Sequence, residues 1–152
     1  MNKTSLTAQA ARHAINAILA WMDAAPQPLS EWRQSNFARY RPLCHNALLA
    51  LGSQASLDKG IWLSASFPIW QADDDQEWGE TTKHWQVELQ PNGIHCTTHT
   101  NLATMMGASQ SYSFTCTDQE ESNEVLIQLG QWELEFDAAL ARPDVFVNVY
   151  ER

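Results

Sequence analysis

The sequence has little positive charge. Its 152 residues include nine lysines and arginines against eighteen aspartates and glutamates, giving a formal net charge of -9. A phosphate backbone and an anionic membrane leaflet both repel such a surface, so we expect neither nucleic acid nor a membrane as a partner. Three arginines, Arg33, Arg39 and Arg41, alternate with aromatic residues as in some single-strand binders, but solvated arginines on a helix account for them better.

Long apolar runs are also absent. The only segment resembling a targeting signal, 14–22, is far shorter than the ~20 residues that cross a bilayer. Arg12 and His13 abut it and Asp23 follows it, which differs from the layout of a cleavable signal. We therefore expect an uncleaved helix in a cytoplasmic protein.

Cysteine is scarce, with Cys44, Cys96 and Cys116 as its three occurrences. An odd number in a chain of this size argues against a disulfide framework and indicates a reducing compartment. Each cysteine occupies an apolar position of a periodic pattern, which predicts free thiols packed in the core.

Motifs of known chemistry are missing too. The sequence contains no G-x-S-x-G, H-E-x-x-H, P-loop or dinucleotide fingerprint. We therefore assign no catalytic residue, no cofactor and no metal ligand, and we expect a non-enzymatic protein.

The first third of the chain has the apolar spacing of two helices. One is predicted from Ser5 to Ala24. The second begins at Glu31 behind Ser30 as its N-cap; Pro42 should kink or divide it and Gly52 should end it.

From Ile61 onward the apolar period changes to two, which predicts strands. The predicted strands cover 61–70, 85–89, 94–100, 112–116 and 145–149. Between Val125 and Phe136 the alternation slips at Gly130, which indicates either a bulge or a hairpin at Gly130 and Gln131, and we favour the hairpin.

Helices followed by strands predict a single α+β domain, with a helical part at about 5–52 and a sheet part at about 60–150. Two N-terminal helices should pack on one face of a mostly antiparallel sheet of about five or six strands, since the chain after Gly60 leaves no room for helical crossovers. The predicted shared core is Ile15, Ile18, Leu48, Leu51, Leu63, Phe67, Val87 and Phe114.

The densest run of acidic residues lies between two predicted strands. Its functional interpretation is a docking loop for a basic protein partner, anchored by a tryptophan. A solvated acidic loop is the simpler interpretation, and a divalent-cation loop is disfavoured because the glycine and the terminal glutamate of a calcium loop are missing. The residues concerned are Asp73, Asp74, Asp75, Glu77, Trp78 and Glu80.

The other candidate site is a pair of histidines, His84 and His99. His95 and His99 lie too far apart on one strand to share a metal, but one of two hairpin registers makes His84 and His99 cross-strand neighbours. Such a pair can hold a metal or respond to pH, although the polar outer face of a sheet is the simpler interpretation.

We therefore expect a partner-binding module, such as an inhibitor, an immunity-type protein, a chaperone or an adaptor, that uses acidic loops and exposed tryptophans. The alternative is a small-molecule-binding domain or an enzyme with a cavity between helices and sheet, and a homodimer joined by its sheet is a third interpretation. The residues predicted to line that cavity are Trp62, Trp70, His84 and His99.

Overall fold

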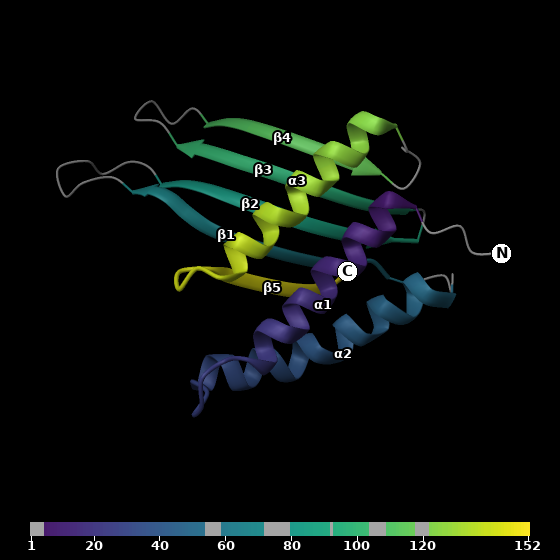
Figure 1. Cartoon of the computed structure of the whole chain (residues 1–152). Coiled ribbons are helices and arrows are strands. Elements are labelled where there is room, and N and C mark those ends of the chain that lie inside the picture. The colour runs from purple at the N-terminus through teal and green to yellow at the C-terminus, as the bar shows by residue number, and fades with distance from the viewer. Residues whose placement is uncertain (1–4, 54–58, 72–79, 92, 104–108, 118–121) are drawn as a thin grey trace.

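The computed structural model describes residues 5–53, 59–71, 80–91, 93–103, 109–117 and 122–152, which form three helices and a five-stranded sheet. The α+β class predicted from the sequence is confirmed (Figure 1). In chain order the elements are α1 (Leu6–Asp23), α2 (Glu31–Ser53), β1 (Ile61–Gln71), β2 (Glu80–Gln90), β3 (Gly93–Ala103), β4 (Ser109–Thr117), α3 (Asn123–Leu140) and β5 (Phe146–Glu151).

The sheet has the order β4-β3-β2-β1-β5, and every neighbouring pair is antiparallel. The first four strands follow one another as a meander. β5 then pairs with β1 at the opposite edge, so the connection from β4 to β5 must cross the sheet. α3 makes that crossing, which corrects the expectation that no helical crossover follows Gly60.

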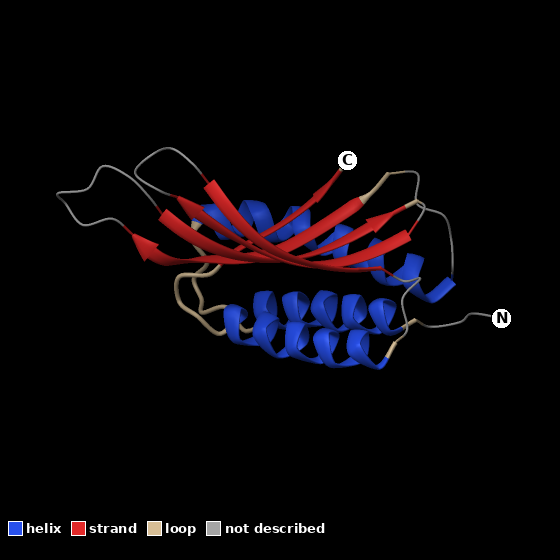
Figure 2. Ribbon diagram, turned by 90° about the horizontal axis from the view of Figure 1, so that it is seen from above, coloured by secondary structure: helices blue, strands red, loops and turns tan. Residues whose placement is uncertain are grey.

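The two N-terminal helices form where the sequence predicts them. The hydroxyl of Ser5 accepts a hydrogen bond from the backbone N–H of Ala8 at 3.0 Å, and Ser30 caps α2 in the same way. Pro42 lies inside α2 without dividing it. α1 packs between α2 and α3, and Figure 2 shows α1 and α2 side by side on one side of the sheet.

The predicted hairpin between Val125 and Phe136 is wrong, because this segment is the middle of α3. Ser122 begins the helix by accepting a hydrogen bond from the N–H of Val125 at 3.2 Å, and Gly130 lies in its middle. The buried residues recur every three or four positions, as a helix requires: Val125, Leu129, Trp132, Phe136, Ala139 and Leu140.

The core lies between the three helices and one face of the sheet. Of the predicted core residues, four are buried: Ile15, Ile18, Leu63 and Val87. Three more are partly buried and pack against that core: Leu48, Leu51 and Phe67. The side chain of Phe114 lies outside the described residues.

The far end of β1 pairs with β2 but not with β5. β5 pairs with β1 only from Ile61 to Ser66, so Pro68 lies on a stretch with no β5 neighbour, as predicted for a proline near the end of a strand. Within the described ranges, no helix combines the length and the apolar character needed to cross a membrane.

Candidate functional site

The predicted acidic docking loop lies mostly outside the described residues. Its residues from Asp73 to Trp78 fall in the segment between β1 and β2, and Glu80 begins β2 with its side chain outside the description. The docking role of this segment stays a prediction.

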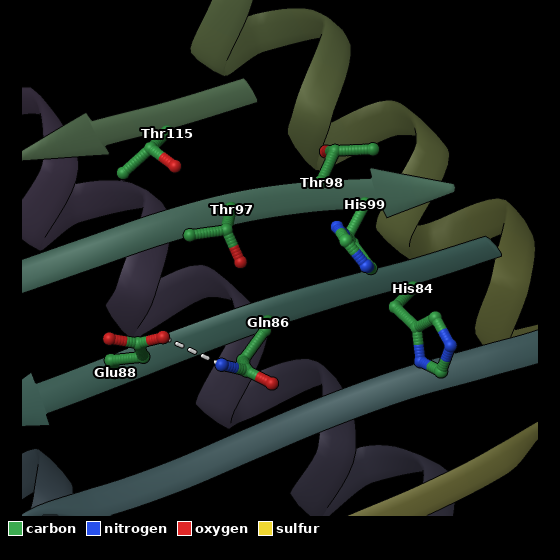
Figure 3. A pocket seen from close by; sticks show the side chains of 7 residues that line it. All are labelled: His84, Gln86, Glu88, Thr97, Thr98, His99 and Thr115. Carbon is green, nitrogen blue, oxygen red and sulfur yellow. Dashed lines mark hydrogen bonds between the residues drawn. The ribbon is translucent and has the colours of Figure 1, made fainter. Parts of the chain in front are cut away.

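Three of the four residues predicted to line a cavity share one face of the sheet, but it is the face opposite the helices. Trp62, His84 and His99 all alternate with residues buried under the helices. Figure 3 looks at this open face, with helical ribbons behind the strands. A bulge between Pro68 and Trp70 breaks the alternation that placed Trp70 on the same face, and its side chain is outside the description.

The observed register makes His84 and His99 cross-strand partners, which is one of the two predicted registers. Their ring centroids lie 6.1 Å apart, and the Nε2 atom of His84 lies 3.0 Å from the hydroxyl of Thr82. Burial lowers the pKa of His84, and the neighbouring His99 lowers it further. Both effects favour the neutral form of His84.

The open face is hollowed beside these histidines by a depression of about 410 Å³. Its wall is polar, and within it Gln86 donates a hydrogen bond to Glu88 at 2.7 Å (Figure 3). Gln90, outside this wall, donates to the other oxygen of Glu88 at 3.0 Å. Typical small-molecule sites are more apolar and more enclosed. The depression therefore resembles the ordinary polar surface of an antiparallel sheet.

On the helix side, the sheet continues beyond α3. Figure 1 shows α3 crossing the strands obliquely, with β1 to β4 extending past it. Two depressions of about 390 and 410 Å³ lie along this flank of α3, and both are lined by Glu135. We call them together the α3 groove. Its α3 wall consists of Ile127, Gln128, Gln131, Trp132, Glu135, Ala138 and Ala139, and its sheet wall of Phe67, Lys83, Trp85 and Thr98, with Arg142 at one end.

Aromatic rings and cations line one end of the α3 groove. The rings of Phe67 and Trp85 stack with centroids 5.5 Å apart. The guanidinium of Arg142 lies 3.9 Å from the centre of the Phe67 ring, and the ammonium of Lys83 lies 5.2 Å from that of Trp85. Because cations are attracted to aromatic faces, these contacts hold the rings in place.

Glu135 fixes the middle of the groove. One carboxylate oxygen accepts a hydrogen bond from the indole N–H of Trp85 at 3.2 Å. The other accepts from Gln131 at 3.1 Å and lies 3.9 Å from the ammonium of Lys83. The carboxylate thus ties α3 to β2 and leaves the groove with a formed wall.

The solvent-facing side of α3 carries a second apolar stripe. Ile127 is 73% exposed and Leu134 is 68% exposed, and with Ala138 they lie close to one line along a helix of about 3.6 residues per turn. Ile127 and Ala138 also line the groove, so this stripe forms its rim. α3 contains four carboxylates and no lysine or arginine: Glu124, Glu133, Glu135 and Asp137.

The cysteines take no part in these surfaces. All three are free and buried, as predicted. Burial raises the pKa of the Cys44 thiol to about 12 and also raises that of Cys96. Such thiols are unreactive near pH 7. In the part of the chain that the structure describes, no cluster of three or more histidine, cysteine, aspartate or glutamate side chains is placed to hold a metal.

The sequence predictions missed the α3 groove because they missed α3. The signal that identifies it is the spacing of Val125, Leu129, Trp132 and Phe136 behind a serine cap. No protein-family model, no curated protein and no solved structure matches this chain.

Proposed function

We propose that this protein is a non-enzymatic module that binds a protein partner along the α3 groove. The observation that carries the proposal is the second apolar stripe of α3, where Ile127 and Leu134 stand in solvent beside a formed groove. Contiguous exposed apolar surface beside a polar rim is typical of interaction sites. Inhibitors, immunity-type proteins, chaperones and adaptors all work through such contacts.

Burial of this stripe would supply binding free energy. Fully burying a leucine or isoleucine side chain contributes about 1.5–3 kcal/mol. Phe67 and Trp85 add aromatic surface to the floor of the groove, and aromatic residues are enriched among those that dominate binding.

Electrostatics favour a basic partner. The chain has a net charge of -9, and every charged side chain of α3 is a carboxylate; these four carboxylates outnumber the two cations that line the groove, Lys83 and Arg142. Complementary charge speeds the encounter of two proteins and excludes wrong partners. We propose that the acidic segment between β1 and β2 adds to the negative electrostatic field that would attract such a partner. The free thiols support a reducing, cytoplasmic setting.

The proposal is tested by comparing what three forms of the tagged full-length protein capture from the cells that make it. Ile127→Asp places a charge on the groove rim. Leu49→Asp places the same charge at a leucine of α2 that is 68% exposed, and serves as the matched control. Quantitative mass spectrometry should find a protein retained by the wild type and Leu49→Asp but lost from Ile127→Asp. Identical captured sets for all three forms would refute partner binding in this groove.

A small polar ligand on the open face is the second candidate. The observation that favours it is the pair of imidazoles, His84 and His99, beside hydrogen-bonding side chains in one depression (Figure 3). A screen of polar metabolites by thermal shift should find a ligand whose stabilisation disappears in His99→Ala. A screen in which no compound stabilises the wild type would count against this candidate.

A further inference from the structure

We infer that Cys96 and Cys116 are a redox modification site, which forms a reversible disulfide between β3 and β4 under oxidising conditions. The observation that carries the inference is their register. They are directly opposite each other on two antiparallel strands that lie side by side at one edge of the sheet (Figure 1). Both are thiols in this structure. The inference does not depend on the partner proposed for the α3 groove.

This register suits a disulfide bond. Residues directly opposite each other in an antiparallel pair have Cα atoms about 4.5 or 5.5 Å apart, and disulfides join Cα atoms about 4.4–6.8 Å apart. The side chains of such a pair point to the same face, and both cysteines are fully buried in the core. Their Cβ atoms need to approach by about 1 Å or less to reach the separation found in disulfides.

Thr7, in the first turn of α1, contacts both sulfur atoms. Its hydroxyl lies 3.3 Å from the Sγ atom of Cys116, and its backbone carbonyl accepts a hydrogen bond from the Cys96 thiol at 3.8 Å. Burial raises the pKa of the Cys96 thiol, and its electrostatic interaction with Cys116 raises the pKa further, as expected for neighbouring sulfur atoms. The two thiols therefore lie close together beneath the start of α1.

The first turn of α1 controls access to the thiols. Thr7 is itself fully buried, and the turn that contains it is closed by the hydroxyl of Ser5, which accepts the N–H of Ala8. The thiols are protected while this turn is closed. Helix ends open locally more readily than a whole domain unfolds. We therefore expect oxidation to be slow and to depend on the Ser5 cap.

Glutathione disulfide is the oxidant that we consider. One cysteine thiolate attacks a sulfur of glutathione disulfide, which releases one glutathione thiolate and leaves a mixed disulfide. The second cysteine thiolate then attacks the protein sulfur of the mixed disulfide and releases the second glutathione thiolate. The two cysteine protons pass to the released glutathiones, and two electrons pass from the protein to glutathione. The product has no S–H group, so the hydrogen bond from Cys96 to Thr7 is lost.

The experiment incubates the native full-length protein with glutathione disulfide, quenches with acid, alkylates the remaining thiols in denaturant and maps the cysteines by mass spectrometry. We expect one disulfide within the chain, between Cys96 and Cys116, and its complete reversal by excess reduced glutathione. Cys44→Ala is the matched control and should form the same disulfide. Cys96→Ala and Cys116→Ala should each form no disulfide within the chain.

Two helix-cap variants test the route through α1. Ser5→Ala should speed disulfide formation about fivefold, because loss of a cap shifts the opening of the first turn by about that factor. Ser30→Ala removes the cap of α2, where the serine hydroxyl accepts the N–H of Arg33 at 3.1 Å. This change should leave the rate of disulfide formation as it is in the wild type.

Three results would overturn the inference: no disulfide in either the wild type or Ser5→Ala, a disulfide that includes Cys44, or disulfides only between chains. Equal acceleration in Ser5→Ala and Ser30→Ala would also overturn it, since the thiols would then react only in the unfolded chain. An unchanged rate in Ser5→Ala would overturn the route through the first turn of α1.

Discussion

α1 and α3 are equal in length and differ in their outer surfaces. Each has 18 residues, begins at a serine N-cap and buries one side in the core. The exposed positions of α1 carry Gln9, Asn16, Ala20 and Asp23. The large apolar side chains that α3 exposes are Leu126, Ile127 and Leu134. The core of this chain therefore covers the apolar side of α1, whereas α3 has more apolar surface than the core covers.

Their inner sides should respond alike to truncation, and this is the largest effect we expect. Phe136 of α3 is fully buried and stacks on Trp132, so Phe136→Ala should lower the free energy of unfolding by about 3–5 kcal/mol. Ile15→Ala in α1 should lower it by about 2–5 kcal/mol. Urea unfolding measures both. A loss below about 1 kcal/mol for Phe136→Ala alone would mean that α3 is not part of the core.

Their N-caps should contribute about equally. Ser5→Ala and Ser122→Ala each remove a hydroxyl that accepts a backbone N–H, which should destabilise the protein by about 1 kcal/mol. Serine-to-glycine changes at the same positions are the controls and should cost only a few tenths of that amount. A cap effect at Ser5 without one at Ser122 would indicate that α3 begins elsewhere.

Gly130 has no counterpart in α1 and gives a sharper test of α3. Apart from its chain neighbours and the backbone of its own helix, a Cβ atom added there meets nothing within 4 Å, so Gly130→Ala should stabilise the helix by about 1 kcal/mol. In a hairpin turn the same change would be unfavourable, because turn glycines often adopt a positive φ. Thermal unfolding decides the sign, and a lower midpoint for Gly130→Ala would restore the hairpin interpretation.

The same comparison explains which elements could be predicted. α1 exposes only polar residues and alanine, so its apolar positions follow one helical stripe, and the predicted range differs from the observed one by a residue at each end. In α3 the exposed Ile127 fills the gap between Val125 and Leu129, and Leu134 fills the gap between Trp132 and Phe136. The buried and the exposed apolar stripes of α3 together produce the period of two that is typical of strands. The exposed apolar residues that suggest a binding surface are therefore also the reason why the sequence pattern did not predict this helix.

The strands show the complementary case. β1, β2 and β3 have one face under helices and one face in solvent, so a simple alternation predicted them and included the observed pairing of His84 with His99 among its two registers. The α3 groove was not predictable by this means. It joins α3 to residues such as Phe67 and Lys83, far apart in the chain, and depends on how far the helix layer extends across the sheet.

The smallest expected effect concerns the outer stripe and decides whether the comparison between α1 and α3 bears on function. Leu134 is 68% exposed, so Leu134→Gln should change the free energy of unfolding by no more than about 0.5 kcal/mol. Asn16→Leu, which gives α1 an exposed leucine, should be equally small. Urea unfolding of both variants beside the wild type measures these differences. If Leu134→Gln instead costs more than about 1 kcal/mol, the stripe contributes to the stability of this chain itself. The reason for expecting a partner on α3 would then be gone, whereas a neutral result makes any loss of binding in stripe variants a direct effect on the contact.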